Sequence, residues 1–250
     1  MKPILFLLPL FGIILLIQPK LVPNLDALKI NQIQCIWSHN SYKQAIDPAL
    51  FSMLTRLDSA ERWPGRFKAI EYSHVSLTEQ LNLGLQNLEI DIYADTKGGK
   101  YAKPFGLTLA KGQALFDSDG VMREPGFKVL HIQDIDLRSN CLTFRQCLAE
   151  LKRWSDVHPN HYPVFITINC KDDTIRRPGF ALPEPFTALV TNHLDSVIVA
   201  GLGRGKLITP DDYTRKKYVA RSDSADRKLA DDTRCTGQIS VCDGRNWPKT

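Results

Sequence analysis

Hydrophobic positions recur with strand-like alternation in short stretches and with helical spacing in longer ones. The strands are expected at residues 33–37, 87–93, 128–135, 163–170 and 206–209. The helices are expected at residues 76–85, 143–154 and 184–199. Strands that alternate with helices indicate βαβ units and a parallel sheet, either a barrel or a doubly wound sheet. Polar side chains gather at the carboxyl ends of the strands, as in barrel active sites, so the fold class expected is an α/β, TIM-type (β/α) barrel.

Two segments punctuate this pattern. Ser76 and Glu79 stand at the start of the first helix with the spacing of a capping box. Residues 94–126 are rich in Gly, Lys and Asp, and we expect an inserted loop or hairpin on the barrel rim. The visible strands are fewer than the eight of a full barrel, which typically takes about 250 residues. The expected barrel domain, residues 33–250, is therefore incomplete at its C-terminus.

The first residues differ in kind from the rest. Met1 and Lys2 give a short positive start, and residues 3–17 form an almost unbroken hydrophobic run. That run fits the core of a signal peptide and is shorter than the about 20 residues that span a bilayer. Residues 1–20 are expected to be a signal peptide or a retained N-terminal anchor. Either way the protein is expected to be exported, as a secreted or periplasmic protein.

Composition and charge exclude some classes of protein but do not indicate a function. The chain is 43% hydrophobic and 24% charged, which is ordinary globular usage and argues against global disorder. A net charge of +5, with no basic stripe interleaved with aromatic residues, argues against a nucleic-acid partner. Export makes the six cysteines candidates for disulfides, with fifteen connectivities open. The local pairs Cys141–Cys147 and Cys235–Cys242 are the first expectation, whereas Cys35 and Cys170 lie in hydrophobic runs that suit buried thiols equally well.

Two carboxylates on one strand carry the first chemical signal. Glu89 and Asp91 alternate with Leu88, Ile90 and Ile92, so they share one face about 6.6–6.8 Å apart along the strand. Two carboxylates beside hydrophobic neighbours repel each other and are costly to desolvate. A bound cation removes that cost, and hard oxygen ligands suit calcium or magnesium.

Other strand ends add groups of complementary chemistry. The first strand ends at His39 and Asn40, and the third contains His131. Alternation from Phe165 places Thr167, Asn169 and Lys171 on one face of the fourth strand. If these ends converge, histidines beside a hard-cation site favour metal-assisted acid–base chemistry over ion storage.

Other polar residues receive structural interpretations. Glu89 and Asp91 would face solvent if their strand lay at an edge, an alternative that their hydrophobic neighbours disfavour. Asp134 and Asp136 fall on the strand face opposite His131 and are interpreted as loop-end or capping residues. The remaining histidines lack an acidic context and are interpreted as structural: His74, His158, His161 and His193.

A family resemblance rests on motifs in a fixed order. They are His39-Asn40-Ser41-Tyr42, Tyr72-Ser73-His74, Gln80-Leu81, Leu88-Glu89-Ile90-Asp91, Val129-Leu130-His131, Cys141-Leu142-Thr143-Phe144, Cys147-Leu148, Trp154-Ser155, His158-Pro159, Pro163-Val164-Phe165-Ile166, Thr209-Pro210-Asp211-Asp212 and Trp247-Pro248. Together they resemble phosphatidylinositol-specific phospholipase C, and more closely its secreted, calcium-dependent microbial branch. The resemblance covers about residues 33 to 250.

The resemblance implies a barrel phosphodiesterase that cleaves the glycerol–phosphate ester of phosphatidylinositol through attack by the inositol 2-hydroxyl. It implies that His39 and His131 are the catalytic pair and that Asn40, Glu89 and Asp91 hold a Ca²⁺ ion. It also implies a phospholipid substrate at a membrane surface, and we expect the protein to act as a monomer.

Two positions depart from the family pattern. Asn169 stands where many relatives carry a further metal-ligating Glu; its amide oxygen still suits calcium, but the site loses a charge. Gln86 stands where relatives often have Arg, and Lys171 is a candidate contact for the substrate phosphate. Two other functions therefore stay open: a phosphodiesterase for glycerophosphodiesters or sphingolipids, and a non-catalytic protein that binds lipid or inositol phosphate.

Overall fold

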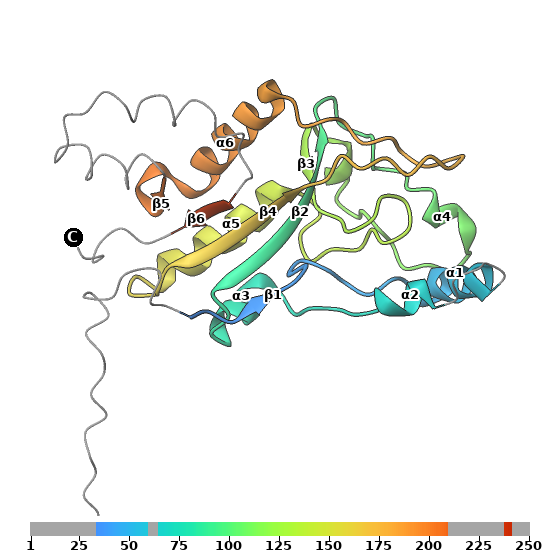
Figure 1. Ribbon diagram of the computed structural model, residues 1–250, viewed down its shortest axis with the longest axis horizontal. Coiled ribbons are helices and arrows are strands. Elements are labelled where there is room, and N and C mark those ends of the chain that lie inside the picture. Colours follow the sequence, from blue (N-terminus) through green and yellow to red (C-terminus); the bar gives the residue numbers. More distant parts are fainter. Residues whose placement is uncertain (1–33, 60–64, 210–237, 242–250) are drawn as a thin grey trace, which may run out of the picture. The chain divides into compact units, whose positions relative to one another are not determined.

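Two long parallel strands form the centre of the fold in a computed structural model that describes residues 34–59, 65–209 and 238–241 (Figure 1). They are β2 (Asn87–Asp95) and β4 (Val164–Cys170), paired in register from Asn87 opposite Phe165 to Ile92 opposite Cys170. Leu88, Ile90 and Ile92 are fully buried, because alternation along β2 places these side chains on the face that packs into the core.

Further strands extend the sheet on both sides of this pair. The order is β1-β2-β4-β6-β5, and β3 pairs with the end of β2. The added strands are β1 (Trp37–Ser38), β3 (Gly126–Lys128), β5 (Leu207–Ile208) and β6 (Gln238–Val241). β1, β2 and β4 are mutually parallel, whereas β3 and β6 run antiparallel to their partners. The described residues thus form a mixed α/β structure with a parallel sheet, and they do not close into an eight-stranded barrel.

Three helices complete the main core with this sheet: α3 (Leu77–Asn82), α5 (Phe144–Val157) and α6 (Ala188–Leu202). The capping box expected at Ser76 and Glu79 is confirmed, and Thr143 and Gln146 form a second one at the start of α5. The helix expected over 184–199 begins later, at Ala188. Pro185 disfavours helical backbone at the residue before it, and the Thr187 side chain accepts the first capping bond from Val190 N.

The strand expected over 128–135 is wrong beyond its first residue. The chain leaves β3 after Lys128 and folds back on itself, so that the backbone N–H groups of His131 and Ile132 both donate to the carbonyl of Asp136. Asp134 adopts a left-handed φ of 71° inside this turn. Hydrophobic alternation predicted a strand, but here the backbone hydrogen bonds are satisfied locally.

Residues 38–70 and 94–126 hold more structure than the sequence pattern indicated. The strand expected over 33–37 is reduced, within the described residues, to Trp37–Ser38. α1 (Pro48–Ser59) and α2 (Arg66–Ala69) follow it. The segment expected to be a loop or hairpin contains α4 (Gly106–Leu109), the 3₁₀ helix η3 (Val121–Arg123) and part of β3, and a further 3₁₀ helix η4 (Arg204–Lys206) precedes β5. The start of α1 was signalled by Asp47-Pro48, since the Asp47 carboxylate accepts from Ala49 N, 3.0 Å away.

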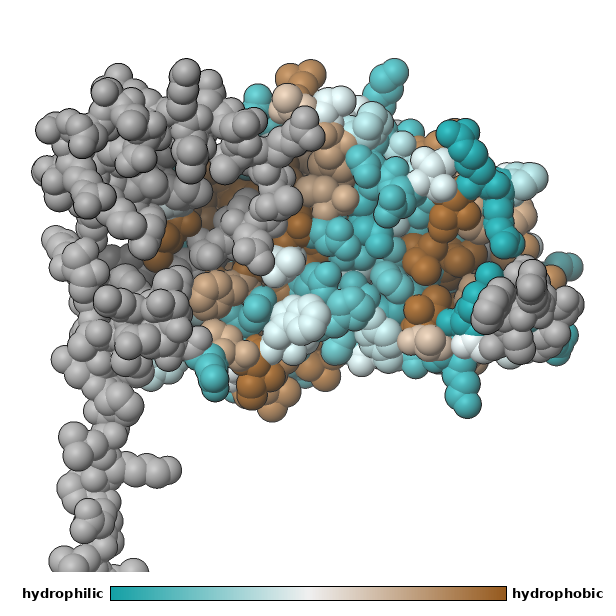
Figure 2. Space-filling view, in the orientation of Figure 1, coloured by the Kyte–Doolittle hydropathy of each residue, from teal (hydrophilic) through white to brown (hydrophobic). Residues whose placement is uncertain are grey.

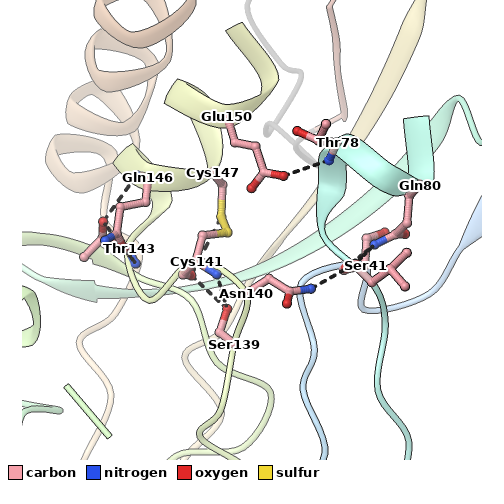
Figure 3. The surroundings of a disulfide bond; sticks show 11 residues. Ser41, Thr78, Gln80, Ser139, Asn140, Cys141, Thr143, Gln146, Cys147 and Glu150 are labelled. Carbon is pink, nitrogen blue, oxygen red and sulfur yellow. Dashed lines mark hydrogen bonds between the residues drawn. A yellow bond between two sulfur atoms is a disulfide. The ribbon is translucent and has the colours of Figure 1, made fainter. Parts of the chain in front are cut away.

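The disulfide expected between Cys141 and Cys147 is present (Figure 3). It joins the loop before α5 to the first turn of that helix, and the adjacent Glu150 accepts from Thr78 N at the start of α3. Cys35 and Cys170 are free thiols, and burial raises the pKa of Cys170 to about 11. The pair Cys235–Cys242 and the expected signal segment at 1–20 lie outside the described residues. Within the described ranges, no helix is long and hydrophobic enough to cross a membrane.

Removal of this disulfide should destabilise the protein. Its sequence separation of 6 closes a short loop, for which loop-closure entropy gives about 2 kcal/mol. We expect the double substitution Cys141→Ala and Cys147→Ala to lower the free energy of unfolding by about that amount in urea titrations. Reductant should produce the same loss in the unchanged protein and no further loss in the variant. Equal stability of the two proteins would contradict this expectation.

Candidate functional site

The loop that follows β1 is attached to β2 at Glu89. Ser41 N donates to the carbonyl of Glu89 at 2.9 Å, and Glu89 N donates to the Ser41 hydroxyl at the same distance. The loop turns at Asn40, which has a left-handed φ of 50°. Ser38 is held through its hydroxyl, which donates to Gln80 Oε1 at 2.7 Å. These bonds carry the residues after β1 to the edge of β2, where the carboxylates are.

His39, Asn40 and Glu89 form the first group of predicted site residues that the structure brings together. His39 Nε2 lies 3.7 Å from Glu89 Oε2, and the backbone N–H of Asn40 donates to the same oxygen at 3.4 Å. The Asn40 amide is buried and donates to the Tyr72 hydroxyl at 2.8 Å, which also lies 3.5 Å from His39 Nδ1. His39 is 59% exposed at its side chain, so its imidazole is accessible to a ligand.

Asp91, Asn169 and Lys171 form the second group. The register of β2 and β4 sets Asp91 opposite Asn169, whose amide donates to Asp91 Oδ1 at 3.1 Å. The Lys171 ammonium lies 3.4 Å from Asp91 Oδ2. Tyr42 connects this group to the first, because its hydroxyl donates to Asn40 Oδ1 at 3.4 Å. Burial raises the pKa of Tyr42 far above its ordinary value, and the charge and hydrogen bond of Asp91 add to the rise.

His131 belongs to a third group that the sequence did not reveal. Its Nδ1 lies 2.7 Å from Asp136 Oδ2, and the Lys43 ammonium lies 3.1 Å from the other oxygen of the same carboxylate. The side chains of Lys43 and Asp136 are completely buried, whereas that of His131 is 15% exposed. The buried pair therefore holds the Nδ1 edge of the imidazole and leaves the Nε2 edge available for chemistry.

Tyr72 lies between this third group and the first. The Lys43 ammonium is 4.7 Å from the centre of the Tyr72 ring and donates to the Tyr72 carbonyl at 3.2 Å. Burial raises the pKa of Tyr72, and the charges of Asp136, Asp91 and Glu89 raise it further. Tyr72 therefore links the two groups through its contacts with Asn40, His39 and Lys43.

The interpretation of Asp136 as a capping residue is wrong. It assumed a continuous strand, in which Asp136 would lie on the face opposite His131; the turn over residues 132–136 instead returns the carboxylate to the imidazole. Asp134 does anchor loops, since its two oxygens accept from Phe105 N and Ala181 N, each at 2.7 Å. Lys43 and Asp136 carried no sequence signal, because their pairing depends on loops that only the tertiary structure brings together.

The donor atoms available for a metal ion are oxygens. Asn40, Glu89, Asp91 and Asn169 offer carboxylate and amide oxygens, the ligand chemistry that Ca²⁺ prefers, so the residues fit that ion by type. Within residues 34–59, 65–209 and 238–241, no group of three or more His, Cys, Asp and Glu side chains is arranged as a metal site. Asp91 has its charge compensated by Lys171 and the Asn169 amide.

Comparison with known proteins gives one family and several structures. The family model described as phosphoinositide phospholipase C, Ca²⁺-dependent, matches residues 28–227. No curated protein matches the chain. Similar solved structures include the calcium-dependent phosphoinositol-specific phospholipase C of a Gram-negative bacterium, Pseudomonas sp. Its myoinositol complex is 16% identical with a TM-score of 0.39 and covers 72% of this chain and 44% of that one. An apo crystal form is 18% identical with a TM-score of 0.35, covering 56% and 40%. The chain spans less than half the length of these proteins.

Proposed function

The chain belongs to the family of Ca²⁺-dependent phosphoinositide phospholipases C, and on that premise we propose that it cleaves the glycerol–phosphate ester of phosphatidylinositol. The inositol 2-hydroxyl attacks the phosphorus, the diacylglycerol oxygen leaves, and a cyclic inositol phosphodiester forms. The observation that carries this proposal is the buried Lys43–Asp136 pair on His131. A histidine held in one orientation by a carboxylate is the arrangement that general acid–base catalysis requires.

In this proposal the two histidines act on opposite sides of the phosphate. His131, with Nδ1 held by Asp136, donates a proton from Nε2 to the leaving diacylglycerol oxygen. His39 lies beside Glu89 and accepts the proton of the attacking hydroxyl. Lys171 is a candidate contact for the phosphate, because its ammonium lies 3.4 Å from Asp91, one of the proposed calcium ligands. The two histidines thus transfer the protons, and the contact with Asp136 orients His131 for its part.

The oxygens of Asn40, Glu89, Asp91 and Asn169 would hold a Ca²⁺ ion. When bound, such an ion supplies charge neutralisation at the phosphate and at the hydroxyl that attacks it. The proposal also includes a TIM-type (β/α) barrel fold, action as a monomer on phospholipid at a membrane surface, and export of the protein.

Activity should therefore depend on calcium. We expect a calcium chelator to abolish release of inositol phosphates from phosphatidylinositol vesicles, and added calcium to restore it. Asp91→Asn removes one ligand charge, so it should raise the calcium concentration for half-maximal activity by about tenfold or more. Asp195→Asn, an exposed position on α6, is the matched control and should leave the calcium dependence unchanged. Equal activity with chelator and with calcium would contradict the proposal.

The substrate profile separates this proposal from related ones. Glycerophosphodiesters and sphingolipids should be turned over far more slowly than phosphatidylinositol, and a preference for either would replace the proposed substrate. The Lys171–Asp91 pair favours a second candidate, a non-catalytic protein that binds inositol phosphate without metal. Binding of inositol phosphate that is unchanged by chelator and by His39→Ala with His131→Ala, without turnover, would support that second candidate.

A further inference from the structure

A hydrophobic cavity of about 800 Å³ lies beside the turn that carries His131. Ile132, the residue next to His131, and Ile135 form one part of its wall. Other parts come from α1, α2, α4 and the segment after β4, including Leu54, Phe67, Leu109 and Phe180. Figure 2 shows hydrophobic side chains gathered on the surface near α4, bordered by hydrophilic ones. A volume of this size is typical of a site for a small-molecule ligand.

The position of the cavity connects it with the candidate active site. Its lining segments follow β1, β2, β3 and β4 along the chain, and the carboxyl ends of the parallel strands β1, β2 and β4 are where α/β folds place ligands. Asp134, itself buried, holds two of these segments together by accepting from Phe105 N and Ala181 N. Gly179 allows the close packing there, because a Cβ atom at its φ of 88° would lie 2.6 Å from the Phe105 ring. These contacts hold the segments of the cavity wall together.

The chemistry of the wall selects the ligand. The charged side chains among the described lining residues are the guanidinium groups of Arg66 and Arg177, and Arg66 is paired with Asp58 at 3.0 Å. A sugar, nucleotide or peptide would leave many polar groups unsatisfied against Leu, Ile and Phe side chains. A long alkyl chain would leave none. The cavity thus fits hydrocarbon.

We propose that this cavity binds one acyl chain of the phospholipid substrate while the phosphodiester lies at His131. The inference rests on the proposed function for the identity of the lipid. The adjacency of His131 and Ile132 in the chain links the cavity to the reacting phosphodiester, because Ile132 lines the cavity and His131 is the proposed acid. The bound acyl chain is then partly withdrawn from the bilayer during catalysis. Turnover of a soluble substrate should consequently depend on the length of its acyl chains.

Chain length in soluble substrates gives the first test. Dibutanoyl and dihexanoyl phosphatidylinositol, both kept monomeric, differ by two methylenes in each chain. Each buried methylene is worth about fourfold, so kcat/KM should rise by about 15-fold from the shorter to the longer substrate. Leu109→Trp places an indole inside the cavity, in the space proposed for the acyl chain, and should lower this ratio. Leu189→Trp, at a position on α6 that is 80% exposed, is the matched control and should keep the ratio.

A binding measurement provides a second test that needs no turnover. A fluorescent fatty acid of eighteen carbons should bind the unchanged protein and Leu189→Trp saturably, and bind Leu109→Trp about tenfold or more weakly. Leu57→Asp repeats the test at the border of the cavity, where the side chain is 50% exposed and folding is least at risk. Circular dichroism would verify that each variant is folded.

The outcomes separate the two claims. Hydrolysis of phosphatidylinositol at the same rate for both chain lengths would overturn the acyl-chain site and leave the proposed function in place. Fatty-acid binding that is lost in both cavity variants, in a protein that hydrolyses no inositol phospholipid, would support the hydrocarbon site and overturn the proposed function. A chain-length ratio that is the same in Leu109→Trp and in the unchanged protein would overturn the site as well.

Discussion

Substitution of His131 by alanine is expected to lower turnover of phosphatidylinositol by about 10²- to 10⁴-fold, the usual loss when a general acid is removed. The imidazole is the group that Asp136 holds in place at 2.7 Å, and its removal leaves the leaving oxygen without the proposed proton donor. The fold should survive, because Asp136 keeps its ion pair with Lys43. Release of inositol phosphate from vesicles, measured at saturating substrate, reports the loss as a change in kcat.

A matched histidine outside the site provides the control. His193 lies on α6, is exposed and stacks on Phe127, and His193→Ala should leave kcat unchanged. Asp136→Asn tests the positioning role separately, since it keeps the size of the side chain while removing the charge that holds the imidazole. It should lower kcat with little change in KM. A variant His131→Ala with undiminished kcat would exclude this histidine from the chemistry.

Substitution of Lys43 by methionine is expected to lower the free energy of unfolding by about 3–5 kcal/mol, which is the usual effect of leaving one partner of a buried ion pair alone. Both side chains of the pair are completely buried, so water cannot replace the lost ammonium. Methionine keeps most of the side-chain volume, and the loss therefore reports charge rather than packing. Urea titration followed by circular dichroism measures it.

A second substitution distinguishes the charge effect from a general disturbance. Asp136→Asn in the Lys43→Met background removes the unpaired carboxylate, and the double variant should recover a large part of the lost stability. Lys152→Met is the control for an exposed ion pair, because Lys152 and Asp156 lie on the surface of α5 at 2.6 Å. It should unfold at the same urea concentration as the unchanged protein. Equal losses in the single and double variants would contradict a charge effect.

The secondary structure that the sequence predicted well is the part with strong periodicity and local signals. Leu88, Ile90 and Ile92 alternate so regularly that β2 was predicted nearly to its ends, and the capping residues Ser76 and Thr143 stand at the starts of α3 and α5. α1 was missed although Leu50, Met53, Leu54 and Leu57 have helical spacing and Asp47-Pro48 marked its beginning. The strand expected after Lys128 failed because alternation says nothing about which partner a backbone finds.

The site shows the same division. The sequence identified His39, Asn40, Glu89 and Asp91 because oxygen ligands and imidazoles at strand ends are unusual enough to be noticed. The structure set the register by which Asp91 meets Asn169, because alternation fixes the face of each side chain but leaves a shift by two residues equally compatible with the pattern. The partner of His131 could not be predicted from the sequence, because the turn over residues 132–136 returns Asp136 to the imidazole.

The sequence by itself determined the family, the central strands and the chemical character of the residues at their ends, because each of these follows from local pattern and residue type. The tertiary structure alone decided which charges meet. It buried Lys43 against Asp136, brought the Tyr72 hydroxyl to Asn40 and His39, and gathered four chain segments around a hydrophobic cavity next to His131. These contacts join residues far apart in the chain, and their energies depend on burial, which only the folded arrangement creates.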